Sequence, residues 1–149
     1  MTAAESEYVT AMIGDQLFGL PISRVQDVFT PERLTRVPLA PPEIAGLLNL
    51  RGRIVTALDM RCRLGLAPLT DGRQRMAIGI ECKGESYGLL IDAIGEVLKL
   101  SSGTREDKPV NLDGRLGRVA AGVHRLDGSL LVVLDVDRVL DVGPHADAA

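Results

Sequence analysis

The chain of 149 residues repeats itself. Residues 18–28 recur 69 positions later as 87–97, and both segments read aromatic-Gly-Leu-x-Ile-x-x-Val/Ile-x-acid-Val. An alternation of apolar residues, typical of a half-buried strand, precedes each segment, at 9–13 and at 78–82. Internal repeats indicate a duplicated structural unit, so the fold has to be built from two similar halves.

A second match lies downstream of the first. Residues 46–59 align with 122–135 at an offset of 76, so the second copy carries seven additional residues. They fall in the polar run 101–109. Because surface loops accept insertions, we expect a longer loop there.

The duplication predicts the domain organisation. We expect one domain over 1–149, made of a first unit at 8–66 and a second unit at 76–142. Exchange of terminal strands between the units is left open. Residues 1–6 and 143–149 are predicted to be flexible ends.

Each unit reads mainly as short strands joined by tight turns. Asp127-Gly128 is typical of a type I′ hairpin turn, and Arg51-Gly52 takes the same place in the first copy. Gly14-Asp15 and Lys83-Gly84 mark further hairpins. A strand-rich unit this small usually avoids exposed edges by closing into a barrel, so we predict a mainly β fold of two small barrels facing each other.

Short helices are expected between some strands. Asp59 and Asp135 each end a strand, and either side chain is typical of the N-cap of a helical run, at 60–66 and 136–142. Two prolines favour a further helix start at 41–46.

Composition excludes several classes of protein. Hydrophobic residues make up 46% and charged residues 25%, which is typical of a globular protein. The net charge of −3 and an aromatic content of 3% argue against nucleic-acid binding. Two cysteines, Cys62 and Cys82, are too few for a disulfide framework, and no apolar stretch approaches the roughly 20 residues of a membrane span. We therefore expect a cytoplasmic protein.

Catalytic and metal-binding patterns are not found in the sequence. His124 is one poor acid–base candidate, and the aspartates 135, 137 and 141 fit a cap and a helix face better than a metal site. Arginines at 51, 53, 61, 63, 73 and 75 are best explained as a solvated face. The sequence thus predicts a non-enzymatic interaction module without cofactors.

The two copies differ at one turn. Residue types that both copies share reflect what the fold requires, whereas the first copy has Arg51 where the second has Asp127. Aspartate is the better turn residue, so Arg51 is not there to make the turn. An arginine at a hairpin tip offers a planar set of donors to a partner's carboxylate or carbonyl group.

These segments resemble the CheW family of chemotaxis coupling proteins. The resemblance rests on residues 18–28, 46–55 and 58–61, on the second-copy segment 88–92, and extends over roughly residues 8 to 142. It implies a fold of two pseudo-twofold-related, five-stranded SH3-like β-barrels with short helices, and no catalysis. One departure is that the family commonly has proline near where this chain has Thr56-Ala57.

The resemblance also implies a protein-binding surface. Arg51 and Asp27 are its polar candidates, Asn49 belongs to the Asn-Leu-Arg-Gly turn, and other positions match sites where coupling is sensitive in the family. Those positions are Val25, Gly46, Gly52 and Val97.

The expected role is that of a scaffold in signal transduction. By resemblance, the partners are the regulatory domain of the histidine kinase CheA, the cytoplasmic tips of methyl-accepting chemoreceptors, and other CheW copies in rings within membrane-associated receptor arrays. An adaptor of a non-flagellar pathway, for surface motility or development, is the alternative. A regulatory domain of a longer kinase, a barrel that binds single-stranded nucleic acid and an enzyme are further alternatives, the last two weakly supported.

Overall fold

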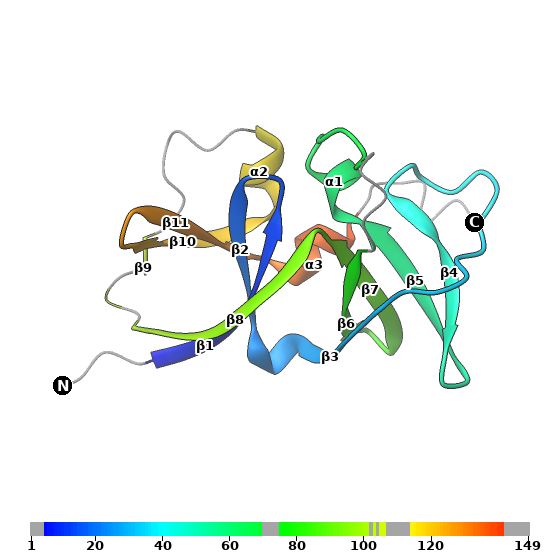
Figure 1. Ribbon diagram of the computed structural model, residues 1–149, viewed down its shortest axis with the longest axis horizontal. Helices are drawn as coiled ribbons and strands as arrows, with labels where there is room; N and C mark the ends of the chain where they lie inside the picture. Colours follow the sequence, from blue (N-terminus) through cyan, green and yellow to red (C-terminus); the bar gives the residue numbers. More distant parts are fainter. Residues whose placement is uncertain (1–4, 70–74, 102, 104, 107–113, 142–149) are drawn as a thin grey trace.

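The computed structural model describes residues 5–69, 75–101, 103, 105–106 and 114–141. Within these residues the strands form two sheets (Figure 1). The six-stranded sheet has the order β8 (Ala93–Ser101), β1 (Glu5–Ile13), β2 (Gln16–Pro21), β11 (Ser129–Leu134), β10 (Ala120–Leu126) and β9 (Arg105–Glu106). The five-stranded sheet has the order β3 (Val25–Phe29), β6 (Met76–Cys82), β7 (Glu85–Ile91), β5 (Arg53–Asp59) and β4 (Ile44–Leu50). The helices are η1 (Ile22–Arg24), α1 (Met60–Arg63), α2 (Gly114–Val119) and α3 (Val136–Leu140).

Each sheet combines strands from both copies of the repeat. The first two strands of the first copy, β1 and β2, lie beside β8 and β11 of the second copy, and β6 and β7 lie in the same way beside β3 and β5. Two parallel pairings join the copies, with Val132 opposite Phe18 and Ala57 opposite Gly88. The predicted mainly β class with short helices is confirmed, and the strand exchange that the duplication left open is present.

The hairpin turns follow the expected positions but differ in conformation. In the turn after β6, φ is 52° at Lys83 and 81° at Gly84, which is the pattern of a type I′ turn. The β10–β11 turn has positive φ at Gly128 (81°) and not at Asp127, so the type I′ prediction is wrong there. A glycine at the second turn position supplies the positive φ by itself.

Two helix predictions concern N-caps, and both are confirmed. The Asp59 carboxylate accepts hydrogen bonds from the backbone N–H groups of Arg61 (3.0 Å) and Cys62 (3.3 Å), and Asp135 accepts one from Arg138 (3.2 Å). Helix α1 ends at Arg63, earlier than predicted, because Gly65 (φ 75°) closes it with hydrogen bonds typical of a Schellman motif.

The helix predicted at 41–46 is wrong. The backbone N–H of Ile44 donates to the carbonyl of Pro41 (2.9 Å), which makes a single turn, and β4 begins at Ile44. The strand continues past a bulge at Gly46, whose φ is 154°. Prolines fit the start of a helix, but the apolar residues that follow are needed to pair with β5.

The chain ends differ in part from the prediction. Glu5 and Ser6, expected among the flexible ends, are the first residues of β1 and pair with Ser101 and Leu100 of β8. Residues 1–4 and 142–149, together with Arg73 and most of the expected loop at 101–109, lie outside the described residues.

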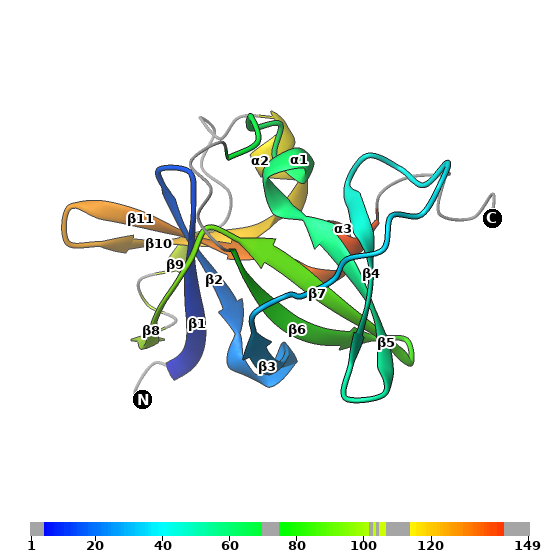
Figure 2. The same cartoon turned by 45° about the vertical axis from the view of Figure 1, so that its right-hand side comes forward.

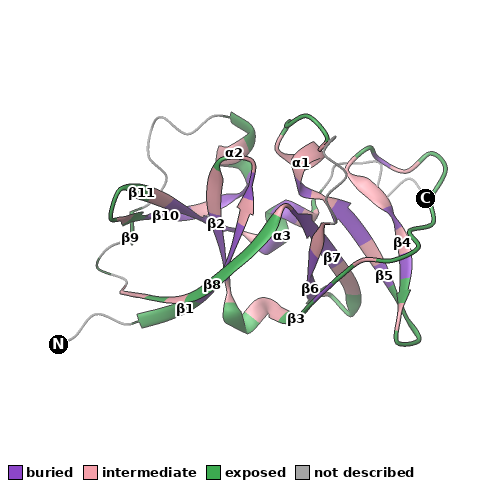
Figure 3. Cartoon of the chain, in the orientation of Figure 1, coloured by how far each residue is buried: buried purple, intermediate pink, exposed green. Residues whose placement is uncertain are grey.

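The main core lies between the two sheets. It includes Phe18 and Leu20 from the six-stranded sheet and Ile80, Leu89 and Ile91 from the five-stranded sheet. A smaller cluster lies at each end of the molecule, one around Phe29 and one around Leu131. Strand β8 is exposed over much of its length (Figure 3).

Candidate functional site

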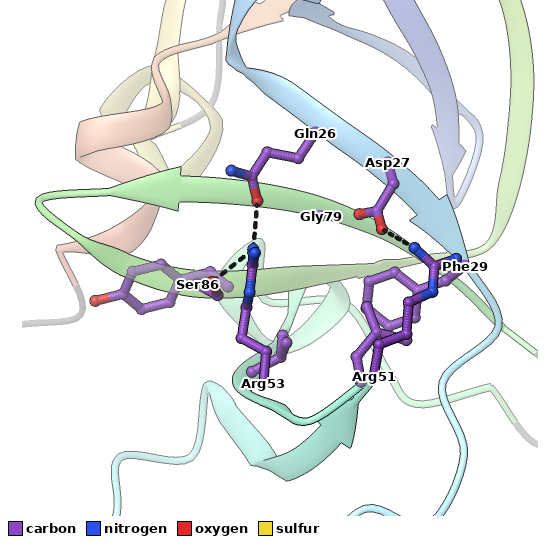
Figure 4. A pocket seen from close by; sticks show the side chains of 10 residues that line it. Gln26, Asp27, Phe29, Arg51, Arg53, Gly79 and Ser86 are labelled. Carbon is purple, nitrogen blue, oxygen red and sulfur yellow. Dashed lines mark hydrogen bonds and ion pairs between the residues drawn. The ribbon is translucent and has the colours of Figure 1, made fainter.

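Four of the predicted site residues meet at the tip of the β4–β5 hairpin. Asn49, Arg51 and Gly52 belong to the tip, which extends beyond the rest of its sheet (Figure 2). Asp27 lies on β3, at the opposite edge of the five-stranded sheet. Arg51 Nη1 lies 3.8 Å from Asp27 Oδ2, so the two edges of the curled sheet approach each other at this point (Figure 4).

Arg51 holds an unfavourable backbone conformation. Its φ is 53° and that of Gly52 is 82°, so the tip has the φ pattern of a type I′ turn. The Asn49 side chain supports this turn, because its Oδ1 accepts a hydrogen bond from the backbone N–H of Gly52 (2.9 Å). A non-glycine residue in the left-handed region costs about 1–2 kcal/mol. A glycine at position 51 would therefore make the turn more stable than the arginine does. The Arg51 side chain is 80% exposed and faces solvent.

A pocket of about 340 Å³ opens between the hairpin and the neighbouring strands. Arg53 crosses it and donates through Nη1 to Gln26 Oε1 (3.4 Å) and Ser86 Oγ (3.5 Å), as Figure 4 shows. Asp27 pairs with Gly79 across the strands, and a Cβ at Gly79 would collide with the Asp27 carboxylate. The lining residues are Gln26, Asp27, Phe29, Leu50, Arg51, Arg53, Val55, Gly79, Ser86 and Tyr87.

Positive charge predominates among the side chains that line this pocket. Two guanidinium groups, of Arg51 and Arg53, line it against one carboxylate, of Asp27. The Tyr87 hydroxyl donates to Glu85 Oε2 (2.8 Å), and burial, together with this carboxylate, raises the pKa of Tyr87 to about 12. Tyr87 therefore stays neutral at physiological pH. An arrangement of this kind favours a ligand group with negative charge.

Sequence reasoning missed most of the pocket lining. The sequence predicts a solvated face for Arg53 and gives no sign that Gln26, Gly79 and Ser86 line a pocket. The usable signal was the comparison of the copies, because Ser86 corresponds to Leu17 and Gly79 to Thr10. Both differences place the smaller residue in the five-stranded sheet, whose β4–β5 hairpin carries Arg51.

The other three predicted site residues lie away from the tip. Val25 is the first residue of β3 and packs against the main core. Gly46 is buried at the bulge of β4, where a Cβ would lie 2.6 Å from the carbonyl oxygen of Thr35. Val97 is 51% exposed on β8 of the six-stranded sheet, opposite Val9 of β1. The structure thus does not bring these three residues into the pocket.

Arginines of the predicted solvated face have separate partners. Arg61 pairs with Asp92 (2.9 Å), and Arg75 pairs with Asp59 (3.1 Å). Arg63 donates to backbone carbonyl groups at the end of α3, including that of Val139 (3.1 Å). The arginines are therefore not equivalent, and among those in the described part of the chain only Arg51 and Arg53 line the pocket.

His124 is a core residue rather than an acid–base group of the surface. It is 1% exposed, and its ring lies 5.4 Å from that of Tyr8. Burial, and then the charge of Arg105, lowers the pKa of His124 below its ordinary value, so the ring is neutral at pH 7. Among the described residues, no group of three potential ligands is arranged to hold a metal ion. In the same part of the chain, no helix is long and apolar enough to cross a membrane.

Comparisons with known proteins agree over nearly the whole chain. Residues 7–143 match the family model described as CheW-like domain. The chain is 27% identical over 139 residues to the chemotaxis protein CheW of Rhizobium meliloti, covering 93% of this chain and 90% of the relative. It is 24% identical to the chemotaxis protein CheW of Thermotoga maritima, covering 92% and 89%. The crystal structure of the scaffolding protein TtCheW from Thermoanaerobacter tengcongensis superimposes with a TM-score of 0.79 at 25% identity, covering 89% of this chain and 90% of that one.

Proposed function

Because this chain belongs to the family of CheW-like domains, we propose that it is a non-catalytic adaptor that couples chemoreceptors to the histidine kinase CheA in chemotaxis. The observation that carries this function is the family match over residues 7–143, together with relatives of similar length that are named chemotaxis proteins. The alternative, an adaptor of a non-flagellar pathway, is not favoured by these relatives.

The hairpin tip is the polar part of the coupling surface in this proposal. Arg51 presents its guanidinium to solvent from a strained turn, and Asp27 and Asn49 hold the geometry around it. A residue kept in a costly conformation at an exposed tip supports a role in binding. Transient modules of this kind can bury little area and still be specific.

Coupling works by positioning in this proposal. Val97 lies on the other sheet from Arg51, which leaves separate surfaces for a receptor and for the kinase. The adaptor acts in the cytoplasm, where membrane-associated receptor arrays recruit it. Contacts that differ between the active and inactive arrangements of the kinase transmit the signal, because only differential affinity can shift such an equilibrium.

Calorimetric titration with the CheA regulatory domain of the same organism tests this function. We expect wild type to bind in the micromolar range and Arg51→Ala to bind about tenfold more weakly. Asp127→Ala, at the corresponding position of the β10–β11 tip, is the matched control and should bind like wild type. Binding that survives Arg51→Ala would move Arg51 to the receptor surface. Absence of binding by wild type to both the kinase domain and a receptor tip would contradict the proposed function.

A further inference from the structure

The pocket beside Arg51 has a filled equivalent in the other half of the molecule. Ser86 corresponds to Leu17, Ala77 to Tyr8 and Gly79 to Thr10 when the two copies are aligned. Each pair exchanges a small residue for a larger one. The five-stranded sheet thus has smaller residues beside its pocket than the six-stranded sheet has at the equivalent positions.

Apolar side chains of the chain itself occupy the equivalent place. Leu131 is fully buried and Tyr8 is 3% exposed, and Leu17 and Leu98 pack against them. On the pocket side, Val55 and Phe29 occupy the positions that correspond to Leu131 and Leu98, with Ser86 in place of Leu17. The pocket therefore keeps an apolar floor and lacks the side chains that fill the equivalent place at the six-stranded sheet.

The charges at the pocket select what fills it. Arg51 Nη1 is 3.8 Å from Asp27, beyond hydrogen-bond length, and Arg53 Nη1 makes contacts of 3.4 and 3.5 Å to neutral groups. Both guanidinium groups can therefore donate shorter hydrogen bonds to an anionic partner. A carboxylate between two arginines gains charge-assisted hydrogen bonds, and methylene groups of its stem gain contact with the apolar floor.

We propose that this pocket receives a glutamate side chain of the protein partner that binds the Arg51 surface, with the carboxylate between Arg51 and Arg53 and the stem against Phe29 and Val55. This inference rests on the proposed function and adds the chemistry of its recognition. Specificity for the partner then depends on an unfilled space as well as on Arg51.

The direct test is to fill the pocket as Leu17 fills the equivalent place at the six-stranded sheet. Ser86→Leu should weaken binding at least tenfold to whichever probe requires Arg51, the CheA regulatory domain or the receptor tip, because the leucine takes the space of the glutamate stem. Ser129→Leu is the matched control, since it adds the same side chain at an exposed residue of β11 away from the pocket, and should bind within about twofold of wild type. Urea denaturation shows whether both variants fold.

The role of charge is tested separately, with a variant that adds no side chain to the pocket. Arg53→Gln should weaken binding about fivefold, and its loss should not add to that of the partner variant in which the inserted glutamate is changed to glutamine. This experiment decides the question even where Ser86→Leu fails to fold. If no partner glutamate shows such coupling, the inference is wrong.

The outcomes separate the inference from the function on which it rests. Normal binding by Ser86→Leu, with loss of binding by Arg51→Ala, would overturn the pocket inference and leave the adaptor function standing. Binding of both probes without any need for Arg51 would also overturn the inference. Wild type that binds neither probe would overturn both.

Discussion

The β4–β5 hairpin and the β10–β11 hairpin hold the same position in the two copies, at opposite ends of the molecule (Figure 1). Both have a two-residue turn that ends in glycine. The first places Arg51 at φ 53° beside an open, charged pocket, whereas the second avoids positive φ at Asp127 and lies over a filled apolar cluster. One architecture is therefore present once with a filled apolar end and once with an open, charged pocket.

The two copies differ in the size of the apolar residues at equivalent positions near these hairpins. The second copy buries Leu131 where the first has Val55 at the floor of a pocket. Because strand exchange makes each sheet from both copies, a stable half supports the other through the shared core.

The largest effect is expected from truncating the filled cluster. Leu131→Ala should lower the free energy of unfolding by about 3 kcal/mol, because Leu131 is fully buried and the cavity left behind cannot fill with water. Val55→Ala, its equivalent, should cost about 1 kcal/mol, because Val55 is smaller and already borders a pocket. Urea denaturation of both variants measures the difference. Equal losses would contradict the view that only one end is built for stability.

The next effect concerns two equivalent glycines inside strands. Gly46→Ala should cost about 2–3 kcal/mol, because φ is 154° and the new Cβ would lie 2.6 Å from the carbonyl oxygen of Thr35. Gly122→Ala should cost about 1 kcal/mol, since its closest neighbour is the flexible side chain of Arg105 at 2.9 Å. Thermal denaturation compares them. A larger loss for Gly122→Ala would show that the bulge of β4 is not the more constrained one.

A third comparison uses two ion pairs between the copies. In one the helix of the first copy supplies the arginine, and in the other the helix of the second copy supplies the aspartate. Arg61 of α1 pairs with Asp92 at 2.9 Å, and at the corresponding place in α3 Asp137 pairs with Arg24 at 3.4 Å. Burial alone would raise the pKa of Asp92, but hydrogen bonds from Arg61 and from the backbone N–H of Gly14 outweigh it and hold that pKa below its ordinary value. The ionised form of Asp92 therefore stabilises the folded state.

The pH dependence follows from the direction of this shift. A lowered pKa in the folded state contributes stability that is complete above the ordinary value of about 3.9 and is lost as pH falls through the folded-state pKa. Asp92→Asn should cost about 2 kcal/mol at pH 7 and progressively less below pH 4. Asp137→Asn, whose carboxylate is 68% exposed, should shift the urea midpoint much less than Asp92→Asn does, because solvent screens its pair with Arg24. A constant difference between wild type and Asp92→Asn down to pH 2 would contradict this assignment.

The fold was largely predictable because the repeat marks it twice. Strand positions, hairpin turns and the N-caps at Asp59 and Asp135 follow from local patterns that both copies share. Strand exchange was not predictable, since strands of similar sequence offer the same edges to either partner. Comparison of the copies marks Ser86 as a small residue but does not predict a pocket there. Ser86 and Val55 come from different copies and meet only because the strands are exchanged.

The smallest expected effect on stability comes from the two hairpin turns themselves, and it tests most directly how they differ. Arg51→Gly should raise the free energy of unfolding by about 1 kcal/mol, because glycine adopts a φ of 53° without steric cost while Asn49 and Gly52 keep the turn. Asp127→Gly, where φ is not positive, should lower it slightly through the added entropy of the unfolded chain. Urea denaturation gives both values, and titration with the CheA regulatory domain or a receptor tip should show binding lost in the first variant alone. A variant at Arg51 that is less stable than wild type would mean that the arginine supports the turn, and the asymmetry between the hairpins would then have a structural cause rather than a functional one.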